Sequence, residues 1–117
     1  MKVNSISGIT CHVEDLAWAA EFYETIGFRR GKEEPDRVTF YVNWFFVTLV
    51  SRDESEIPTK GAGQSLYVKV DDVQEFHKAA LSKGLNPAGE PERQPSGNRE
   101  FVLRDPDGYN LVFFQKK

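Results

Sequence analysis

Val13-Glu14-Asp15-Leu16 recurs as Val70-Asp71-Asp72-Val73, and Gly27-Phe28 recurs as Gly84-Leu85. Each pair is separated by 57 residues, about half of the 117-residue chain. In each copy an apolar stretch leads into an Asp, whose carboxylate can cap the first turn of a helix. The Gly that follows can end that helix in the left-handed conformation. The chain is therefore predicted to contain two copies of one module, and a duplicated module usually has its functional site where the copies meet.

The first module is predicted to be a strand, a helix and three further strands. Apolar residues recur at helical spacing between Asp15 and Gly27. Pro35-Asp36 and the region of Asn43 have the composition of tight turns, so the strands around them are antiparallel. The predicted strands of this module are residues 6–13, 28–34, 37–43 and 44–51.

The second module repeats this order. Asp72 and Glu75 have the spacing of a capping box, at the start of a helix that runs to about Lys83. Residues 86–98 contain three prolines and two glycines, so the strand expected there is short or irregular. Asp105-Pro106-Asp107-Gly108 predicts a turn, in which both aspartates are turn residues rather than ligands. The predicted full-length strands of this module are residues 65–70, 99–104 and 109–115.

These elements predict an α+β fold. Two tandem βαβββ modules form a curved mixed sheet with a cleft, and the helices lie on its outer face. We expect one domain over residues 1–117, because the length suits a single core. Within it, module one covers about 1–51, a polar linker about 52–63, and module two about 64–117.

The segment from Asp105 to Phe114 resembles the C-terminal turn and strand of the vicinal oxygen chelate superfamily. That superfamily includes glyoxalase I, bleomycin resistance proteins, fosfomycin resistance proteins and extradiol dioxygenases. Val13-Glu14-Asp15-Leu16, Phe22-Tyr23 and Gly27-Phe28 are similar to its first module. The resemblance covers nearly the whole chain and implies the βαβββ fold, but the fold hosts many chemistries.

The enzymes of this family hold a divalent metal with one ligand from each of four strands. The first ligand is usually a His seven residues before the helix-capping Asp, and the last is a carboxylate four residues after the Gly of the final turn. The resemblance places residues other than His, Asp or Glu at all four positions: Gly8, Thr48, Ser65 and Val112. We therefore expect no metal site and no cofactor.

Strand alternation predicts which side chains line the cleft. They combine aromatic area with a few hydrogen-bonding groups, as small-molecule pockets do. His12 and Tyr67 are candidates for catalysis, although no nucleophile or paired carboxylate accompanies them. Lys69 could hold an anionic group or reach into solvent, and the aromatic residues could instead fill the core. The predicted ligand-binding residues are Thr10, His12, Phe46, Thr48, Ser65, Tyr67, Lys69, Asn110, Val112 and Phe114.

The composition limits which binding partners and which cellular compartment are expected. The net charge of −3 and the scattered basic residues argue against nucleic acid or an anionic membrane as a partner. The single cysteine, Cys11, excludes an intramolecular disulfide and suggests a buried core residue in a reducing compartment. No signal peptide is evident, so a cytoplasmic location is expected. Trp18 is a candidate dimer contact if it is exposed, and His77 is expected on the outer side of the second helix.

These observations lead to one hypothesis and two alternatives. The first is a metal-free protein of the bleomycin resistance type, which binds an antibiotic or metabolite and forms a homodimer, as the resemblance implies. The second is a lyase, isomerase or dioxygenase with an atypical site, whose turnover would depend on His12. The third is a non-catalytic interaction or sensor module, in which aromatic side chains fill the cleft.

Overall fold

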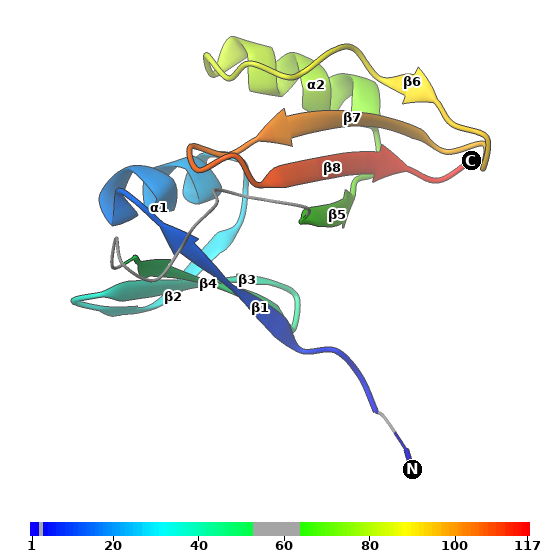
Figure 1. The fold of residues 1–117 in the computed structure, drawn as a ribbon. Coiled ribbons are helices and arrows are strands. Elements are labelled where there is room, and N and C mark those ends of the chain that lie inside the picture. Colours follow the sequence, from blue (N-terminus) through cyan, green and yellow to red (C-terminus); the bar gives the residue numbers. More distant parts are fainter. Residues whose placement is uncertain (3, 53–63) are drawn as a thin grey trace. The chain divides into compact units, whose positions relative to one another are not determined.

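The computed structural model describes residues 1–2, 4–52 and 64–117 (Figure 1). The chain divides into two compact units, residues 1–58 and residues 59–117, which we call unit one and unit two. The predicted linker at 52–63 lies outside the described residues except for Arg52. Among the helices of the described part, none is long and apolar enough to cross a membrane.

Both units have the predicted order of one strand, one helix and three strands (Figure 1). Their sheets have matching strand orders, β1-β4-β3-β2 and β5-β8-β7-β6. In each sheet the first and last strands of the unit pair in parallel, and the other neighbours are antiparallel. The α+β class and the two tandem modules are thus confirmed. Unit one comprises β1 (Gly8–Val13), α1 (Leu16–Thr25), β2 (Arg29–Glu34), β3 (Arg37–Val42) and β4 (Phe45–Ser51). Unit two comprises β5 (Ser65–Lys69), α2 (Val73–Ser82), β6 (Glu92–Arg93), β7 (Arg99–Arg104) and β8 (Asn110–Gln115).

The repeated Asp residues begin both helices. The carboxylate of Asp15 accepts a hydrogen bond from the backbone N–H of Trp18 at 3.0 Å. The carboxylate of Asp72 accepts one from the N–H of Glu75 at 3.1 Å. These bonds satisfy donors that the first turn of a helix cannot satisfy itself.

The repeated glycines end both helices in the same way. Gly27 has φ +103° and Gly84 has φ +80°, a conformation that glycine adopts without steric cost. In unit one the N–H of Phe28 donates to the carbonyl of Tyr23, and in unit two the N–H of Leu85 donates to that of Ala80. This is the 6→1 bond of the Schellman motif, so the repeat predicts both ends of both helices.

An aromatic cluster fills the space between each helix and its sheet. In unit one, Tyr23 is fully buried and meets Phe22, Phe28 and Phe40 with ring centroids 5.3–6.1 Å apart. Cys11 is 1% exposed, which confirms its assignment to the core. These contacts fix which face of the first sheet α1 covers.

In unit two, α2 lies over β7 and β8 (Figure 1). Phe76 and Phe113 stack at 4.5 Å, and Phe101 stacks on Phe113 at 5.4 Å. His77 is only 8% exposed, so its predicted outer position is wrong. Its ring packs edge-on against Phe101 at 5.0 Å, and its Nε2 lies 3.0 Å from the carbonyl oxygen of Gly89. A hydrogen bond thus compensates the burial of this polar side chain.

Candidate functional site

Each sheet has one face covered by its helix and one face turned away from it, which we call the helix-distal face. Residues directly opposite one another on neighbouring strands point to the same face, and successive residues alternate between faces. In unit one the buried positions Val47 and Leu49 on β4 belong to the helix side with Phe40 on β3. The intervening positions therefore form the helix-distal face, and their register divides them into three rows across the strands.

The first row is Arg29, Tyr41, Phe46 and Gly8, one residue from each of the four strands. The rings of Tyr41 and Phe46 meet edge to face with centroids 6.5 Å apart. The guanidinium carbon of Arg29 lies 5.3 Å from the centroid of the Tyr41 ring, within the range of a cation–π contact. A Cβ placed on Gly8 would overlap the ring of Phe46. The row thus has an aromatic pair, Tyr41 and Phe46, at its centre. The guanidinium of Arg29 lies beside Tyr41, and Gly8 lies beside the ring of Phe46.

The second row consists of threonines: Thr39, Thr48 and Thr10 on β3, β4 and β1. The hydroxyl oxygens of Thr39 and Thr48 are 3.0 Å apart and form a hydrogen bond. Thr48 is buried, whereas Thr10 is exposed. A hydroxyl can both donate and accept, so this row can hydrogen-bond to several kinds of polar group.

The third row contains Glu34, Arg37, Val50 and His12. Arg37 forms an ion pair with the carboxylate of its neighbour Asp36 at 3.0 Å. The hydrogen bond from Arg37 lowers the pKa of the Asp36 carboxyl below its ordinary value. The charge of Arg37 is therefore compensated locally, outside the centre of the face.

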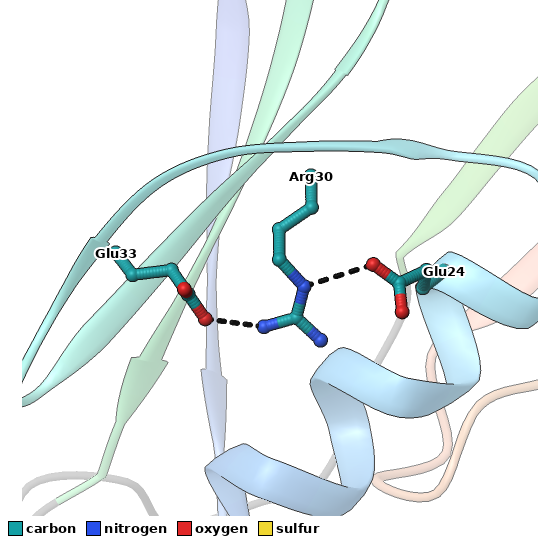
Figure 2. A network of polar contacts seen from close by, with 3 residues as sticks. All are labelled: Glu24, Arg30 and Glu33. Atoms are coloured by element: carbon teal, nitrogen blue, oxygen red, sulfur yellow. Dashed lines mark hydrogen bonds and ion pairs between the residues drawn. The ribbon is translucent and has the colours of Figure 1, made fainter.

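Arg30, the neighbour of Arg29 on β2, faces the helix side of the sheet. Its Nε donates to Glu24 at 3.0 Å and its guanidinium also donates to Glu33, as Figure 2 shows. The hydrogen bond to Glu24 is the main cause that raises the pKa of Arg30. A groove of about 420 Å³ lies beside this network, and its lining includes the apolar residues Ala20 and Val38. Because two carboxylates already engage Arg30, the network serves to fix α1 against the β2–β3 hairpin.

The helix-distal face of unit two has a different character. Its central row is apolar apart from one hydroxyl: Tyr67, Val112 and Val102. Its outer rows carry polar or charged residues. In one of them, Lys69 and Glu100 lie on either side of Phe114. Tyr67 is 66% exposed, and its ring meets that of Phe114 at 6.3 Å. The remaining row joins Ser65, Asn110 and Arg104.

The strand registers place the sequence-predicted site residues in two separate groups. In unit one, Thr10 pairs with Thr48, while Phe46 and His12 lie in the rows on either side. In unit two, each β5 residue pairs with a predicted β8 residue: Ser65 with Asn110, Tyr67 with Val112, and Lys69 with Phe114. Their meeting in one cleft, like their role in binding, remains a prediction.

Three residues in the first two rows of this face were not predicted from the sequence: Arg29, Thr39 and Tyr41. Two of them alternate along β3 with the buried Val38 and Phe40, and this alternation was a usable signal. The position of Arg29 could not be found in that way, because β2 has a register shift between Arg30 and Glu33. Counting back from the Pro35-Asp36 turn would place Arg30, not Arg29, opposite Tyr41.

The residues at the four metal-ligand positions of the resembled enzymes do not fit a metal ion. Gly8 has no side chain, and the ring of Phe46 occupies the space where one would begin. The hydroxyl of Thr48 is engaged by Thr39, and Val112 is a buried hydrocarbon. Ser65 offers one neutral hydroxyl, which is a weak ligand beside the imidazoles and carboxylates that divalent metals prefer. Among the described residues, no three His, Cys, Asp or Glu side chains are grouped to hold a metal.

The fold and the repeat agree with a sequence-family match. The sequence profile of the Glyoxalase/Bleomycin resistance protein/Dioxygenase superfamily matches residues 5–113. The chain belongs to this superfamily. No curated protein matches the sequence.

Solved structures share the fold across almost the full chain. Lactoylglutathione lyase from Agrobacterium tumefaciens is 22% identical with a TM-score of 0.78, and covers 98% of this chain and 96% of its own. A bleomycin resistance determinant encoded on the transposon Tn5 is 21% identical with a TM-score of 0.78, and covers 97% and 99%. A virulence protein from Salmonella typhimurium is 20% identical with a TM-score of 0.81, and covers 100% of both chains. At these identities the likeness concerns the fold, which proteins of different function share.

Proposed function

We propose that this superfamily member is a metal-free small-molecule binding protein of the bleomycin resistance type, with an antibiotic or a metabolite as its ligand. The observation that carries the proposal is the ring of Phe46 over Gly8. The resembled enzymes have a metal-binding imidazole where this chain has an aromatic surface. The neighbouring threonine row adds hydrogen-bonding groups, and this combination is typical of small-molecule binding sites.

The predicted ligand-binding residues of unit two extend this proposal. The exposed Tyr67 and the half-buried Phe114 offer a second aromatic pair, and Asn110 adds a carboxamide. The carboxamide oxygen of Asn110 is buried, with no hydrogen-bond partner among the residues that the structure describes. A ligand N–H or O–H would satisfy it.

The test has a metal arm and a ligand arm. Untagged protein is dialysed against Zn²⁺, Ni²⁺, Mn²⁺ and Fe²⁺ in turn, and its metal content is then measured. We expect no stoichiometric retention. A library of aromatic small molecules is next screened by amide chemical-shift perturbation, and we expect shifts on β1, β3 and β4. One retained ion per chain, or no ligand binding at millimolar concentration, contradicts the proposal.

The variant Phe46→Ala tests whether the aromatic row itself binds. Loss of one ring contact costs about 0.5–1.5 kcal/mol, so we expect affinity to fall roughly 3- to 10-fold. Phe45→Ala is the matched control, because Phe45 is the adjacent residue of β4 and its ring meets Trp44 rather than Tyr41. Equal loss in both variants would mean that the ring of Phe46 has no specific role.

We also propose a cytoplasmic homodimer. Trp18 on α1 is 61% exposed, and large exposed aromatic side chains are enriched at protein interfaces. The buried thiol of Cys11, alone in the sequence, suits a reducing compartment. Sedimentation equilibrium of the wild type and of Trp18→Ser tests the dimer, and a monomeric wild type would contradict it.

A further inference from the structure

Two adjacent arginines on β2 have opposite environments. Arg30 is engaged by Glu24 and Glu33 on the helix side, so its charge is compensated (Figure 2). Arg29 is exposed on the helix-distal face, where its guanidinium lies over the ring of Tyr41. Within the described residues no carboxylate forms an ion pair with Arg29. Among the described residues, Arg29 is therefore a cation that the ring of Tyr41 orients and that no carboxylate neutralises.

Across the described strands of this face, the acidic residue is Glu34, which lies opposite Arg37 in the third row, at the far end of β2 from Arg29. The helix-distal positions of β1, β3 and β4 contain no Asp or Glu; they are Gly8, Thr10, His12, Arg37, Thr39, Tyr41, Phe46, Thr48 and Val50. Arg37 is compensated by Asp36 and lies opposite Glu34, whereas no described carboxylate pairs with Arg29. The equivalent face of unit two differs, because Lys69 shares its row with Glu100 and Glu92.

We propose that the helix-distal face of unit one selects aromatic ligands that carry a carboxylate, and that Arg29 binds this carboxylate. The inference rests on the proposed function and names the ligand class for the same site. A guanidinium that stacks on a ring keeps its in-plane N–H groups free, and these match a carboxylate in bidentate geometry. Tyr41 and Phe46 contact the aromatic part of the ligand.

The spacing between neighbouring strands also sets the length of a ligand that spans this face. Arg29 on β2 and Thr48 on β4 are two strands apart, about 10 Å at the usual spacing of neighbouring strands. A bicyclic aromatic acid is long enough to place its carboxylate at Arg29 while its far end reaches the threonine row. A polar group at that far end would hydrogen-bond to Thr10 or Thr39.

The experiment compares three probes that share a ring system and differ in charge: 2-naphthoate, 2-naphthamide and 2-naphthylmethylamine. Binding to the full chain is measured by calorimetry at low salt. We expect 2-naphthoate to bind about tenfold more tightly than the cationic amine, since the carboxylate gains a charge-assisted bidentate contact whereas the guanidinium repels the ammonium group. The variant Arg29→Gln should remove this preference, so that 2-naphthoate and the amine bind with similar affinity.

Two further variants separate position from net charge. Lys32→Gln removes one positive charge from the same strand and should keep the preference for 2-naphthoate. Arg29→Lys keeps the charge but loses the planar stacking, so the preference should weaken without vanishing.

The outcomes distinguish the two proposals. If the amine binds as well as 2-naphthoate, or if Arg29→Gln keeps the preference, the carboxylate inference is wrong while the binding function stands. If none of the three probes binds the wild type at millimolar concentration, the inferred ligand class is wrong, and the library screen decides the proposed function separately.

Discussion

The two modules connect their last two strands in different ways. In unit one, Val42 pairs with Phe45, so only Asn43 and Trp44 form the turn. In unit two, Arg104 pairs with Asn110, and a five-residue turn organised by Asp105 lies between them. The carboxylate of Asp105 accepts hydrogen bonds from the N–H groups of Asp107 and Tyr109, both at 2.9 Å. The same topology therefore tolerates either a short backbone turn or a longer turn held by a buried side chain.

The edge strands differ as well. β2 has six residues and pairs with β3 on both sides of its register shift, whereas β6 has only two residues. The prolines of residues 86–98 lack the N–H that a longer ladder requires. In unit two a hydrogen bond between His77 and Gly89 instead fastens the irregular segment to the helix. The caps and terminal glycines that the modules share fix the topology, while turns and edges vary without changing it.

The largest effect is expected for Asp105→Ala. The substitution leaves two N–H groups without their acceptor in a buried turn, which should reduce the free energy of unfolding by about 3 kcal/mol. Amide hydrogen exchange should accelerate first in β7 and β8, and much less in β3 and β4. If amide exchange accelerated equally in both units, the turn would stabilise the whole chain rather than unit two alone.

A smaller effect is expected for His77→Leu. The hydrogen bond to the Gly89 carbonyl is lost while an apolar side chain of similar volume replaces the imidazole, so we expect the free energy of unfolding to fall by about 1.5 kcal/mol. Exchange at residues 86–92 should increase more than exchange in β7. The control is Phe76→Leu, which weakens the aromatic stack but keeps the hydrogen bond. If both variants loosen residues 86–92 equally, ring packing rather than the hydrogen bond holds the segment.

The short turn of unit one contains Asn43, which has φ +55°. Substitutions at this position should change the stability of the protein. Alanine tolerates this left-handed conformation less well than asparagine, so Asn43→Ala should cost about 1 kcal/mol, measured by urea unfolding. Asn43→Gly should be neutral or slightly stabilising, because glycine adopts positive φ freely. If glycine destabilised the protein as much as alanine, the side chain of Asn43, rather than its tolerance of positive φ, would stabilise the turn.

The smallest expected effect is a pH dependence at the β2–β3 turn. Arg37 lowers the pKa of Asp36 in the folded protein, so this contribution to stability is present above the unfolded pKa of about 3.9 and is lost as the pH falls through the folded pKa. The Asp36 carboxyl should therefore titrate below its ordinary value when followed by NMR. In Arg37→Gln it should return toward that value, and a titration unchanged by this variant would exclude the ion pair as the cause.

Several features of this protein could be predicted from the sequence because they depend on local chemistry. An N-capping Asp and a C-terminal Gly act within one helical turn, so the repeated pairs at Asp15 and Gly27 and at Asp72 and Gly84 mark both helices. The absence of ligand side chains at Gly8 and Val112 is likewise visible without coordinates. Strand alternation predicted that Thr10 and Thr48 share one face with the ring of Phe46.

Other features were decided only by the tertiary structure, because they depend on pairings between distant strands. His77 points inward because the irregular segment that pairs poorly with β7 presents a carbonyl to it. The ring of Phe46 lies over Gly8 because parallel pairing brings β1 beside β4. A one-residue shift in β2 places Arg29, and not Arg30, opposite Tyr41, since each such shift moves a side chain to the other face of the sheet. The charge of the face that we propose binds the ligand therefore follows from register, which no local pattern in the sequence specifies.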